Sequence, residues 1–390
     1  MSSRDIVLLS TADWDNPFWT NKQHVAVELA RSGHRVLYID SLGLRRPSAS
    51  ARDFARIAKR LIKAVRPPRK VRDNLWVWSP IVLPWHGNAC VRKINSLLLN
   101  AGLWTSLKIL GMRREWLWTY NPLTTEFFDF STFNYCIYHC VDEIKAQPGM
   151  PVETLERAEK QLAQKVDVIF TTSPQLTVTR STWNKNTHYL PNVADYDHFS
   201  TAQSDHTLIP PDIAKIPSPR IGFIGAISGY KIDFQLIRQI AQTHPDWSVV
   251  LIGDIGEGDP WTDSSVIKGV SNIHLLGPRP YNSLPAYLKG FDVALLPNNV
   301  NEYTDSMFPM KFFEYLAAGK PVVSVNLKAL KEFSDVASIV DSTDEFISAI
   351  AGALTDDHQA LDKRLATAKK YTYEARTKRM LTIIEESSRA

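Results

Sequence analysis

Two charged residues one helical turn apart, Lys311 and Glu314, have the types and the spacing needed to bind a nucleotide. Residues three positions apart lie on the same face of a helix. An ammonium group attracts a phosphate, and a carboxylate can accept two hydrogen bonds from a vicinal diol such as ribose. The alternative is a pair of solvated surface residues, because the same spacing is common on exposed helices.

The residues around this pair predict a helix and then a buried strand. An apolar stripe at helical spacing is formed by Phe312, Tyr315 and Leu316. Gly319 is typical of a helix end, and residues 321–324 are typical of a strand inside a sheet. Because Pro309 precedes the helix, we expect its first turn to face open space, where unpaired N–H groups favour a bound anion.

Residues 308–323, Phe-Pro-Met-Lys-Phe-Phe-Glu-Tyr-Leu-Ala-Ala-Gly-Lys-Pro-Val-Val, resemble the donor-binding helix of GT-B glycosyltransferases. The chain is most similar to bacterial exopolysaccharide transferases such as the xanthan glucuronosyltransferase type. The resemblance covers most of the chain and is strongest over 220–325. It implies that Glu314 binds the ribose and that Met310 and Lys311 lie against the nucleotide and its diphosphate.

Three other segments complete the expected donor site. The strand 221–225 ends at Gly225, and glycines in the turn that follows allow close approach to a ligand, with Lys231 able to reach a phosphate. The resemblance makes Arg279 a contact for the base or a phosphate, with a surface role as the alternative. The loop 298–308 is expected to select the donor sugar through Tyr303, Asp305 and Ser306. Many retaining relatives have a glutamate at the Ser306 position. The adjacent Asp305 is the alternative for that role, and the incomplete pattern leans slightly to inversion.

The first half of the chain also alternates strands and helices. Residues 6–10 and 35–40 predict strands, and 21–32 predict the helix between them, a pattern typical of a doubly wound sheet. No Gly-x-Gly-x-x-Gly turn follows the first strand, which argues against a dinucleotide oxidoreductase.

A candidate general base, Asp142, follows the predicted strand 135–140. Ligands of open α/β sheets bind beyond the carboxyl ends of the strands, so a carboxylate there could deprotonate an acceptor hydroxyl. Related transferases have an aspartate at a similar strand end. The alternatives are that Asp142 or Glu143 caps the next helix, or that His139 is the base rather than a core residue.

The length of 390 residues predicts two hydrophobic cores. The expected architecture is α/β: two doubly wound, Rossmann-like domains that face each other across a cleft, as in GT-B enzymes. We place the acceptor domain at 1–205 and the nucleotide-sugar domain at 215–370, with residues 200–219 as the linker. The resemblance implies that a last helix, 371–390, crosses back to the first domain.

Composition narrows the function further. Hydrophobic and charged contents of 44% and 22% are typical of a globular protein, and no apolar run is long enough to cross a membrane or to form a signal peptide, so we expect a cytoplasmic enzyme. A net charge of +4 does not indicate a nucleic-acid partner. The cysteines Cys90, Cys136 and Cys140 match no metal or disulfide spacing, and the last two are expected to be buried and inert. Neither a metal nor a cofactor is expected.

Positive charge is concentrated between Arg45 and Arg72, where eleven Lys/Arg accompany a single acid. The predicted helix has an apolar stripe and a basic face that includes Arg56, Lys59, Arg60 and Lys63. Such a helix can lie on an anionic membrane, where each nearby cation contributes about 1 kcal/mol. The alternative is a helix packed on the domain with its basic face in water.

These observations predict a transferase that moves a sugar from a nucleotide sugar, with UDP favoured, to a lipid-linked or polysaccharide acceptor at the inner face of the cytoplasmic membrane. The rival functions are a nucleotide-sugar epimerase of the same fold and a non-catalytic sugar-binding scaffold.

Overall fold

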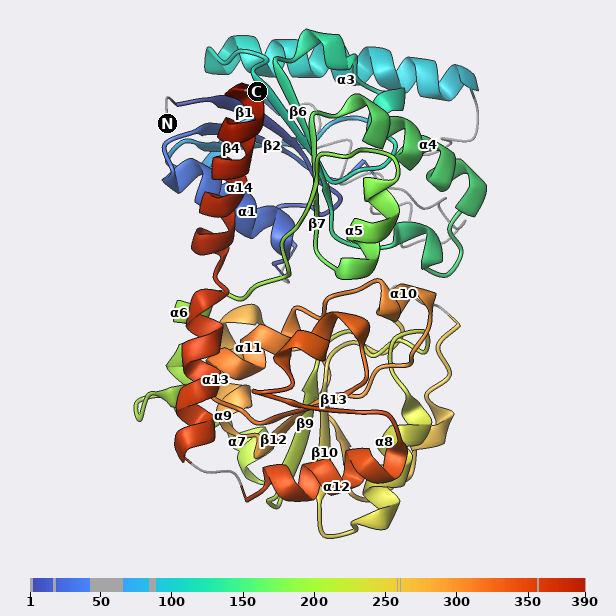
Figure 1. Ribbon diagram of the computed structural model, residues 1–390, viewed down its shortest axis with the longest axis vertical. Helices are drawn as coiled ribbons and strands as arrows, with labels where there is room; N and C mark the ends of the chain where they lie inside the picture. The colour runs from blue at the N-terminus through green and yellow to red at the C-terminus, as the bar shows by residue number, and fades with distance from the viewer. Residues whose placement is uncertain are drawn as a thin grey trace. The chain divides into compact units, whose positions relative to one another are not determined.

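A computed structural model describes residues 3–16, 19–42, 66–83, 89–257, 259, 261–355 and 358–389, which form two compact α/β units. The first unit contains the described residues up to Thr172, then 176–190 and the tail from Thr377. The second contains 173–175 and 191–376. Figure 1 shows both units as sheets with helices on their faces.

The first unit is built on an eight-stranded sheet in the order β3-β4-β2-β1-β5-β6-β7-β8. Every pairing is parallel except that of β3 with β4. Central strands such as β1 are apolar throughout their interior because helices cover both faces of the sheet. The strands are β1 Asp5–Leu9, β2 Arg35–Ile39, β3 Arg69–Arg72, β4 Leu75–Trp78, β5 Trp116–Thr119, β6 Tyr135–Cys140, β7 Val168–Thr171 and β8 Thr187–Tyr189.

Helices pack on both faces of this sheet. One hydrophobic core joins it to α1 (Asn21–Arg31) and to the end of α14 (Tyr373–Arg389), which lies near α1 in Figure 1. The other core joins it to α3 (Ala89–Leu110), α4 (Val152–Lys165) and α5 (Pro174–Ser181). The carboxyl ends of the strands remain available for polar side chains.

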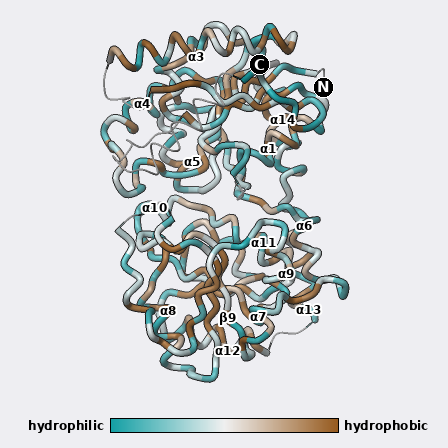
Figure 2. The backbone as a smooth tube through the Cα atoms, turned by 180° about the vertical axis from the view of Figure 1, so that it is seen from behind, coloured by the Kyte–Doolittle hydropathy of each residue, from teal (hydrophilic) through white to brown (hydrophobic). Residues whose placement is uncertain are grey.

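The second unit has a fully parallel six-stranded sheet in the order β11-β10-β9-β12-β13-β14. Strands β10 and β11 follow β9 toward one edge of the sheet, whereas β12, β13 and β14 extend toward the other edge. In doubly wound folds, ligands bind at this switch point, here between β9 and β12. Figure 2 shows the chain around β9 in brown, the colour of hydrophobic residues. The strands are β9 Arg220–Ile224, β10 Ser248–Ile252, β11 Ile273–Leu275, β12 Val293–Leu296, β13 Val322–Val325 and β14 Ser338–Val340.

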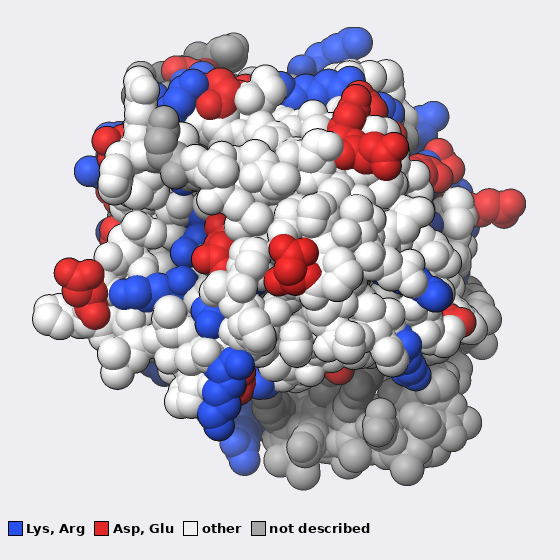
Figure 3. All heavy atoms as spheres, turned by 90° about the horizontal axis from the view of Figure 1, so that it is seen from below, with Lys and Arg blue, Asp and Glu red and all other residues white. Residues whose placement is uncertain are grey.

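Two hydrophobic cores also lie on either side of this sheet. One holds α8 (Phe234–Thr243) and α12 (Thr343–Ala353). The other holds α6 Tyr196–Ser200, α7 Pro211–Ala214, α9 Leu284–Lys289, α11 Lys311–Ala317 and α13 His358–Lys370. A short helix, α10 (Glu302–Asp305), lies in the loop before α11. On the face of the molecule shown in Figure 3, basic and acidic residues are interspersed.

The predicted α/β fold with two parallel sheets is confirmed, and strands such as 135–140 have the predicted bounds. The segment 200–219 is not a linker. Its Ser and Pro content suggested one, but Ala202, Ile213 and Ile216 are buried in the core of the second unit. Residues 191–205, predicted for the first domain, likewise belong to the second unit.

The last helix begins in one unit and ends in the other. Its residues from Thr377 onward belong to the first unit. Four of its apolar side chains there are at most 4% exposed: Met380, Leu381, Ile383 and Ile384.

Some predictions fall outside the described residues. The basic residues Arg56, Lys59, Arg60 and Lys63 lie in 43–65, which the structure does not describe. Within the described ranges, no helix has the length and hydropathy to cross a bilayer. Cys136 and Cys140 are buried as predicted, and burial raises the pKa of Cys136 to about 12.

Candidate functional site

The helix α11 is fixed against the end of strand β9. Phe312, Tyr315 and Leu316, the predicted stripe, are fully buried. The Tyr315 hydroxyl accepts a hydrogen bond from the Ile224 N–H at 2.9 Å and donates one to the Ile224 carbonyl at 3.2 Å. These bonds hold α11, whose N-cap is Met310, beside the carboxyl end of β9.

The predicted pair of Lys311 and Glu314 forms an ion pair in this turn. The Lys311 Nζ lies 2.6 Å from the Glu314 Oε2, and the two side chains are 26% and 5% exposed. Burial raises the pKa of Glu314, and the nearby Lys311 charge opposes that rise. The solvated alternative is therefore wrong for Glu314: a carboxylate is held almost out of water with an ammonium as its partner.

Several polar groups near Glu314 were not among the predicted site residues. His198, on α6, and Asp195 affect its ionisation. The His198 ring stacks on Tyr281 with centroids 4.5 Å apart, and the charge of Glu314 adds to burial in raising the pKa of Tyr281. A sequence signal existed only for Asp195, which ends the segment 189–195 that resembles the family's Pro-Asn-Gly-Val-Asp turn.

Glycines follow three adjacent strands, β9, β10 and β11. Gly225 donates its N–H to the Ile252 carbonyl at 2.9 Å, and Gly253 donates its own to the Gly277 carbonyl at 3.1 Å. Gly253 has φ +155°, and a Cβ added to it would lie 1.8 Å from the Gly225 oxygen. The predicted glycine turn thus belongs to a row of three, and the repeated strand-then-glycine pattern was visible in the sequence.

Lys231 and Tyr303, predicted on separate loops, lie together. The Lys231 Nζ is 5.2 Å from the centroid of the Tyr230 ring and 5.4 Å from that of Tyr303. Asn301 ties the loops by donating its side-chain N–H to the Tyr230 carbonyl at 2.7 Å. The glycine loop and the predicted donor-sugar loop therefore form one surface that includes a cation.

Arg279 is held by a segment that was predicted to be a linker. Its guanidinium donates to the Asp212 carboxylate at 2.7 Å and to the Tyr287 hydroxyl at 2.6 Å. The pKa of Asp212 is lowered, since these hydrogen bonds outweigh the opposing effect of desolvation. Arg279 as a nucleotide contact stays a prediction.

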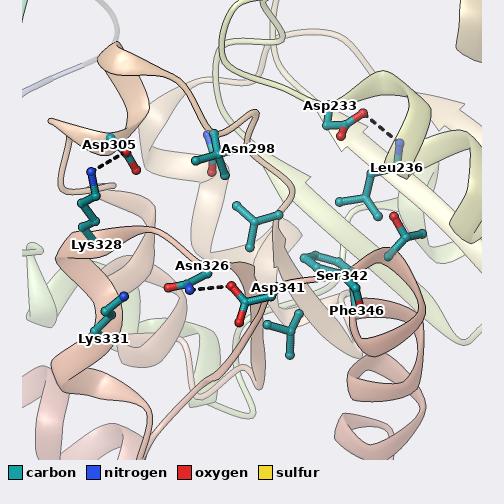
Figure 4. Close-up of a pocket in the computed structure, with 14 residues that line it drawn as sticks. Asp233, Leu236, Asn298, Asp305, Asn326, Lys328, Lys331, Asp341, Ser342 and Phe346 are labelled. Atoms are coloured by element: carbon teal, nitrogen blue, oxygen red, sulfur yellow. Dashed lines mark hydrogen bonds and ion pairs between the residues drawn. The ribbon is translucent and has the colours of Figure 1, made fainter.

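The other residues of the predicted donor-sugar loop differ in environment. Ser306 is buried, whereas Asp305 forms an ion pair with Lys328 at 2.8 Å. Asp305 lines a pocket of about 520 Å³ beyond the ends of β12, β13 and β14, as Figure 4 shows. The lining also includes Asn298, Lys331 and Asp341, but neither Lys311 nor Glu314, so this pocket is not the predicted nucleotide site.

In the first unit, the structure places Asp142 directly beyond β6, next to a lysine that the sequence did not single out. Lys22, in the first turn of α1, has its Nζ 3.9 Å from the Asp142 Oδ2 and 5.8 Å from the centroid of the Tyr120 ring. The exposed fractions of the Lys22 and Asp142 side chains are 11% and 30%. Asp142 is thus accessible to a substrate at a strand end that also carries positive charge.

Glu143, considered as a cap of the next helix, and His139, considered as the alternative base, are both buried. Glu143 is buried and accepts two hydrogen bonds from Arg180, at 2.5 and 2.8 Å, while the same guanidinium also binds Glu159. His139 is fully buried, and its ring stacks on Tyr120 with centroids 4.8 Å apart. Both therefore belong to the core beneath the strand ends rather than to its surface. In the described part of the chain, no group of three or more His, Cys, Asp or Glu could hold a metal ion.

Part of the chain matches a protein-family model. Residues 218–356 match the model described as "Glycosyl transferases group 1". A relative from Bacillus subtilis (strain 168), the proposed teichuronic acid biosynthesis glycosyltransferase TuaH, is 30% identical over 183 residues. This alignment covers 45% of the chain and 44% of TuaH, so the chain matches less than half the length of that curated relative.

Solved structures resemble the whole chain. Sucrose-phosphate synthase from Thermosynechococcus elongatus has a TM-score of 0.69 at 15% identity, covering 98% of both chains. HepE from Anabaena, in complex with UDP, has a TM-score of 0.66 at 13% identity, covering 98% of this chain and 100% of its own. The catalytic domain of starch synthase IV from Arabidopsis thaliana has a TM-score of 0.65 at 12% identity over the full length of both chains. These similarities show the GT-B fold.

Proposed function

We propose that this chain, whose residues 218–356 form a group 1 glycosyltransferase domain on the GT-B fold, transfers a sugar from a UDP-linked donor to a lipid-linked or polysaccharide acceptor. The observation that carries the proposal is the buried Glu314 paired with Lys311 beside the end of β9. The complex of HepE with UDP supports the choice of nucleotide, and the name of TuaH supports an acceptor of the cell-surface polysaccharide class.

Nucleotide binding would exchange the Lys311–Glu314 contact for two contacts with the donor. The ribose hydroxyls would donate to the Glu314 carboxylate, and the diphosphate would bind Lys311. A buried carboxylate with few partners gains from two new donors, which favours the exchange. Lys231, in the loop after Gly225, would add a second cation for the diphosphate, so that no metal is required.

In the transfer step, the acceptor oxygen attacks the anomeric carbon while the bond from that carbon to the diphosphate oxygen breaks. The hydroxyl proton passes to the Asp142 carboxylate. Negative charge develops on the departing nucleoside diphosphate, and Lys311 and Lys231 would stabilise it. Lys22, 3.9 Å from Asp142, would keep that carboxylate oriented.

Calorimetry with UDP and GDP tests the donor site. Lys311→Ala should lower UDP affinity about tenfold or more, because one charge-assisted contact of 1.5–3 kcal/mol is lost. Lys328→Ala, which removes a cation from the separate pocket of Figure 4, is the matched control and should leave UDP affinity unchanged. A wild-type protein that binds neither nucleotide would indicate a scaffold.

Transfer itself is tested with Asp142→Asn, which should abolish turnover and preserve UDP binding. Near-normal turnover of this variant would show that Asp142 is not the base. Conversion of the donor sugar in the absence of any acceptor would instead identify an epimerase.

We further propose that the basic residues Arg56, Lys59, Arg60 and Lys63 hold the enzyme on the inner face of the cytoplasmic membrane, where a lipid-linked acceptor lies. The sequence supports this through its eleven cations between Arg45 and Arg72. Replacing the four residues with Glu should release the protein from anionic vesicles without changing nucleotide affinity. Unchanged vesicle binding would refute this part of the proposal.

A further inference from the structure

The helix α3 is apolar on the side that faces away from its domain as well as on the side that packs. Leu99, Leu103 and Leu107 are at most 5% exposed and lie in the core beneath the sheet. Of the twelve large hydrophobic residues that are exposed in the described part of the chain, five lie on this one helix: Ile94 (45%), Leu97 (65%), Leu98 (41%), Trp104 (59%) and Ile109 (58%). A helix that is apolar all round is normally covered on every side.

These residues form one surface, which we call the α3 face. At about 100° per residue the five positions fall within an arc of about 140° around the helix axis, so they lie along one side of the helix over about 22 Å. Figure 2 shows brown, hydrophobic segments recurring along α3. Exposed patches of this kind mark contacts with a membrane or another protein.

The charged residues of α3 and of the turn after it are all positive. Residues 89–114 contain five Lys/Arg and no Asp or Glu. Lys93 and Lys108, both exposed, stand at its two ends, and the Lys108 Nζ lies 5.5 Å from the centroid of the Trp104 ring. An apolar centre with a tryptophan and lysines at its ends matches the boundary between the acyl chains and the anionic headgroups of a bilayer.

The α3 face also adjoins the end of the basic segment. Arg66 is the first described residue after 43–65, and it lines a hollow of about 300 Å³ together with Leu98 and Ile109 of the α3 face. The chain that carries most of the clustered cations therefore leaves the described structure beside this apolar surface.

We propose that the α3 face is a membrane-docking surface, which inserts its apolar side chains at the interface of an anionic bilayer. This inference rests on the proposed function, since it gives the enzyme access to a lipid-linked acceptor, and it assigns the apolar part of the contact to residues other than the basic segment. In the described part of the chain no helix, α3 included, is long and apolar enough to span a membrane. A helix that docks on a bilayer lies in the plane of the interface instead.

Vesicle binding of the full-length protein tests the α3 face. Cys90, in the first turn of α3, is exposed whereas Cys136 and Cys140 are buried, so a polarity-sensitive dye can be attached at Cys90. On vesicles of phosphatidylglycerol and phosphatidylcholine, its emission should shift as the helix enters the interface. The variant Leu97→Glu/Trp104→Glu should bind these vesicles at least tenfold more weakly than wild type.

Matched controls separate the α3 face from general hydrophobicity. Val178→Glu and Trp261→Glu replace side chains that are as exposed, 64% and 70%, but lie elsewhere. Both should bind vesicles as wild type does. The α3 variant should keep its UDP affinity and its turnover with a water-soluble acceptor, so loss of docking is distinguishable from loss of the transferase function.

Three results would overturn the proposal. The first is that the α3 variant binds vesicles as tightly as wild type does. This would overturn the proposal even if replacing the four basic residues with Glu abolishes binding. The second is a dimer in sedimentation that the α3 variant converts to a monomer, which would make a second copy the occupant. The third is slow thiol labelling of Leu97→Cys in a Cys90→Ser background without vesicles, because the chain itself would then cover the surface.

Discussion

At the scale of single residues, the site keeps a carboxylate where ionisation is unfavourable. Burial raises the pKa of Glu314, with only partial compensation from Lys311. The folded state therefore holds the proton more tightly than the unfolded state does. The contribution of this group to stability is full below the unfolded pKa of about 4.3 and is lost as the pH rises through the higher folded pKa. Retaining such a group fits a role in binding rather than in folding.

Replacing Glu314 with Gln should stabilise the protein near neutral pH, because burial makes the ionised carboxylate unfavourable in the folded state and the neutral amide does not carry that cost. The gain relative to wild type should shrink as the pH falls toward 4.3, where the carboxyl is protonated in both states. Urea unfolding at several pH values measures this difference.

The same variant should bind UDP more weakly, since an amide accepts fewer hydrogen bonds from a diol than a carboxylate does. Glu302→Gln, on the exposed side of α10, is the control and should change neither quantity. Equal UDP affinity in Glu314→Gln and wild type would exclude a ribose contact.

At the scale of elements, the strand ends of the second unit are brought together by glycines. Gly225 and Gly253 approach so closely that a methyl group cannot fit between them. The loops after β9 and β10 therefore form a single floor next to α11, which Tyr315 ties to the same end of β9.

Gly253→Ala should separate these loops and weaken UDP binding. Gly269→Ala is a matched control, because Gly269 also has a positive φ, +78°, but nothing lies within 4 Å of its added Cβ. The control should lose about 1–3 kcal/mol of stability from backbone strain alone and keep its UDP affinity. Gly253→Ala should lose more stability than the control does, as measured by thermal unfolding. It should also bind UDP more weakly, as measured by calorimetry. Equal behaviour of the two variants would contradict the role given to the glycine row.

At the scale of the whole molecule, the chain end completes the first unit. The residues of α14 from Thr377 onward bury Met380, Leu381, Ile383 and Ile384 in the same core as α1 and β1. Each fully buried aliphatic side chain contributes about 1.5–3 kcal/mol, so the tail is a substantial part of that core.

Deleting residues 377–390 should therefore destabilise the first unit by several kcal/mol. Calorimetric unfolding should show an early transition that UDP does not shift. The second unit, which retains Lys311 and Glu314, should still bind UDP and be stabilised by it. A single unchanged transition in the deletion variant would show that the tail contributes little.

The sequence by itself determined the parts of this protein that follow from local pattern. Apolar runs and helical stripes predicted the two parallel sheets and α11, because hydrophobic periodicity reflects burial. The family resemblance over 220–325 likewise agrees with the group 1 match over 218–356.

Only the tertiary structure decided which distant residues meet. Lys22 lies near Asp142, and Arg279 binds Asp212 in the segment that was predicted to be a linker. Glu314 is buried rather than solvated. Each of these findings depends on packing between segments that are far apart in the chain. Residues 200–219 were misread for the same reason: Pro and Ser content is a local property, whereas the burial of Ile213 depends on the core against which it packs.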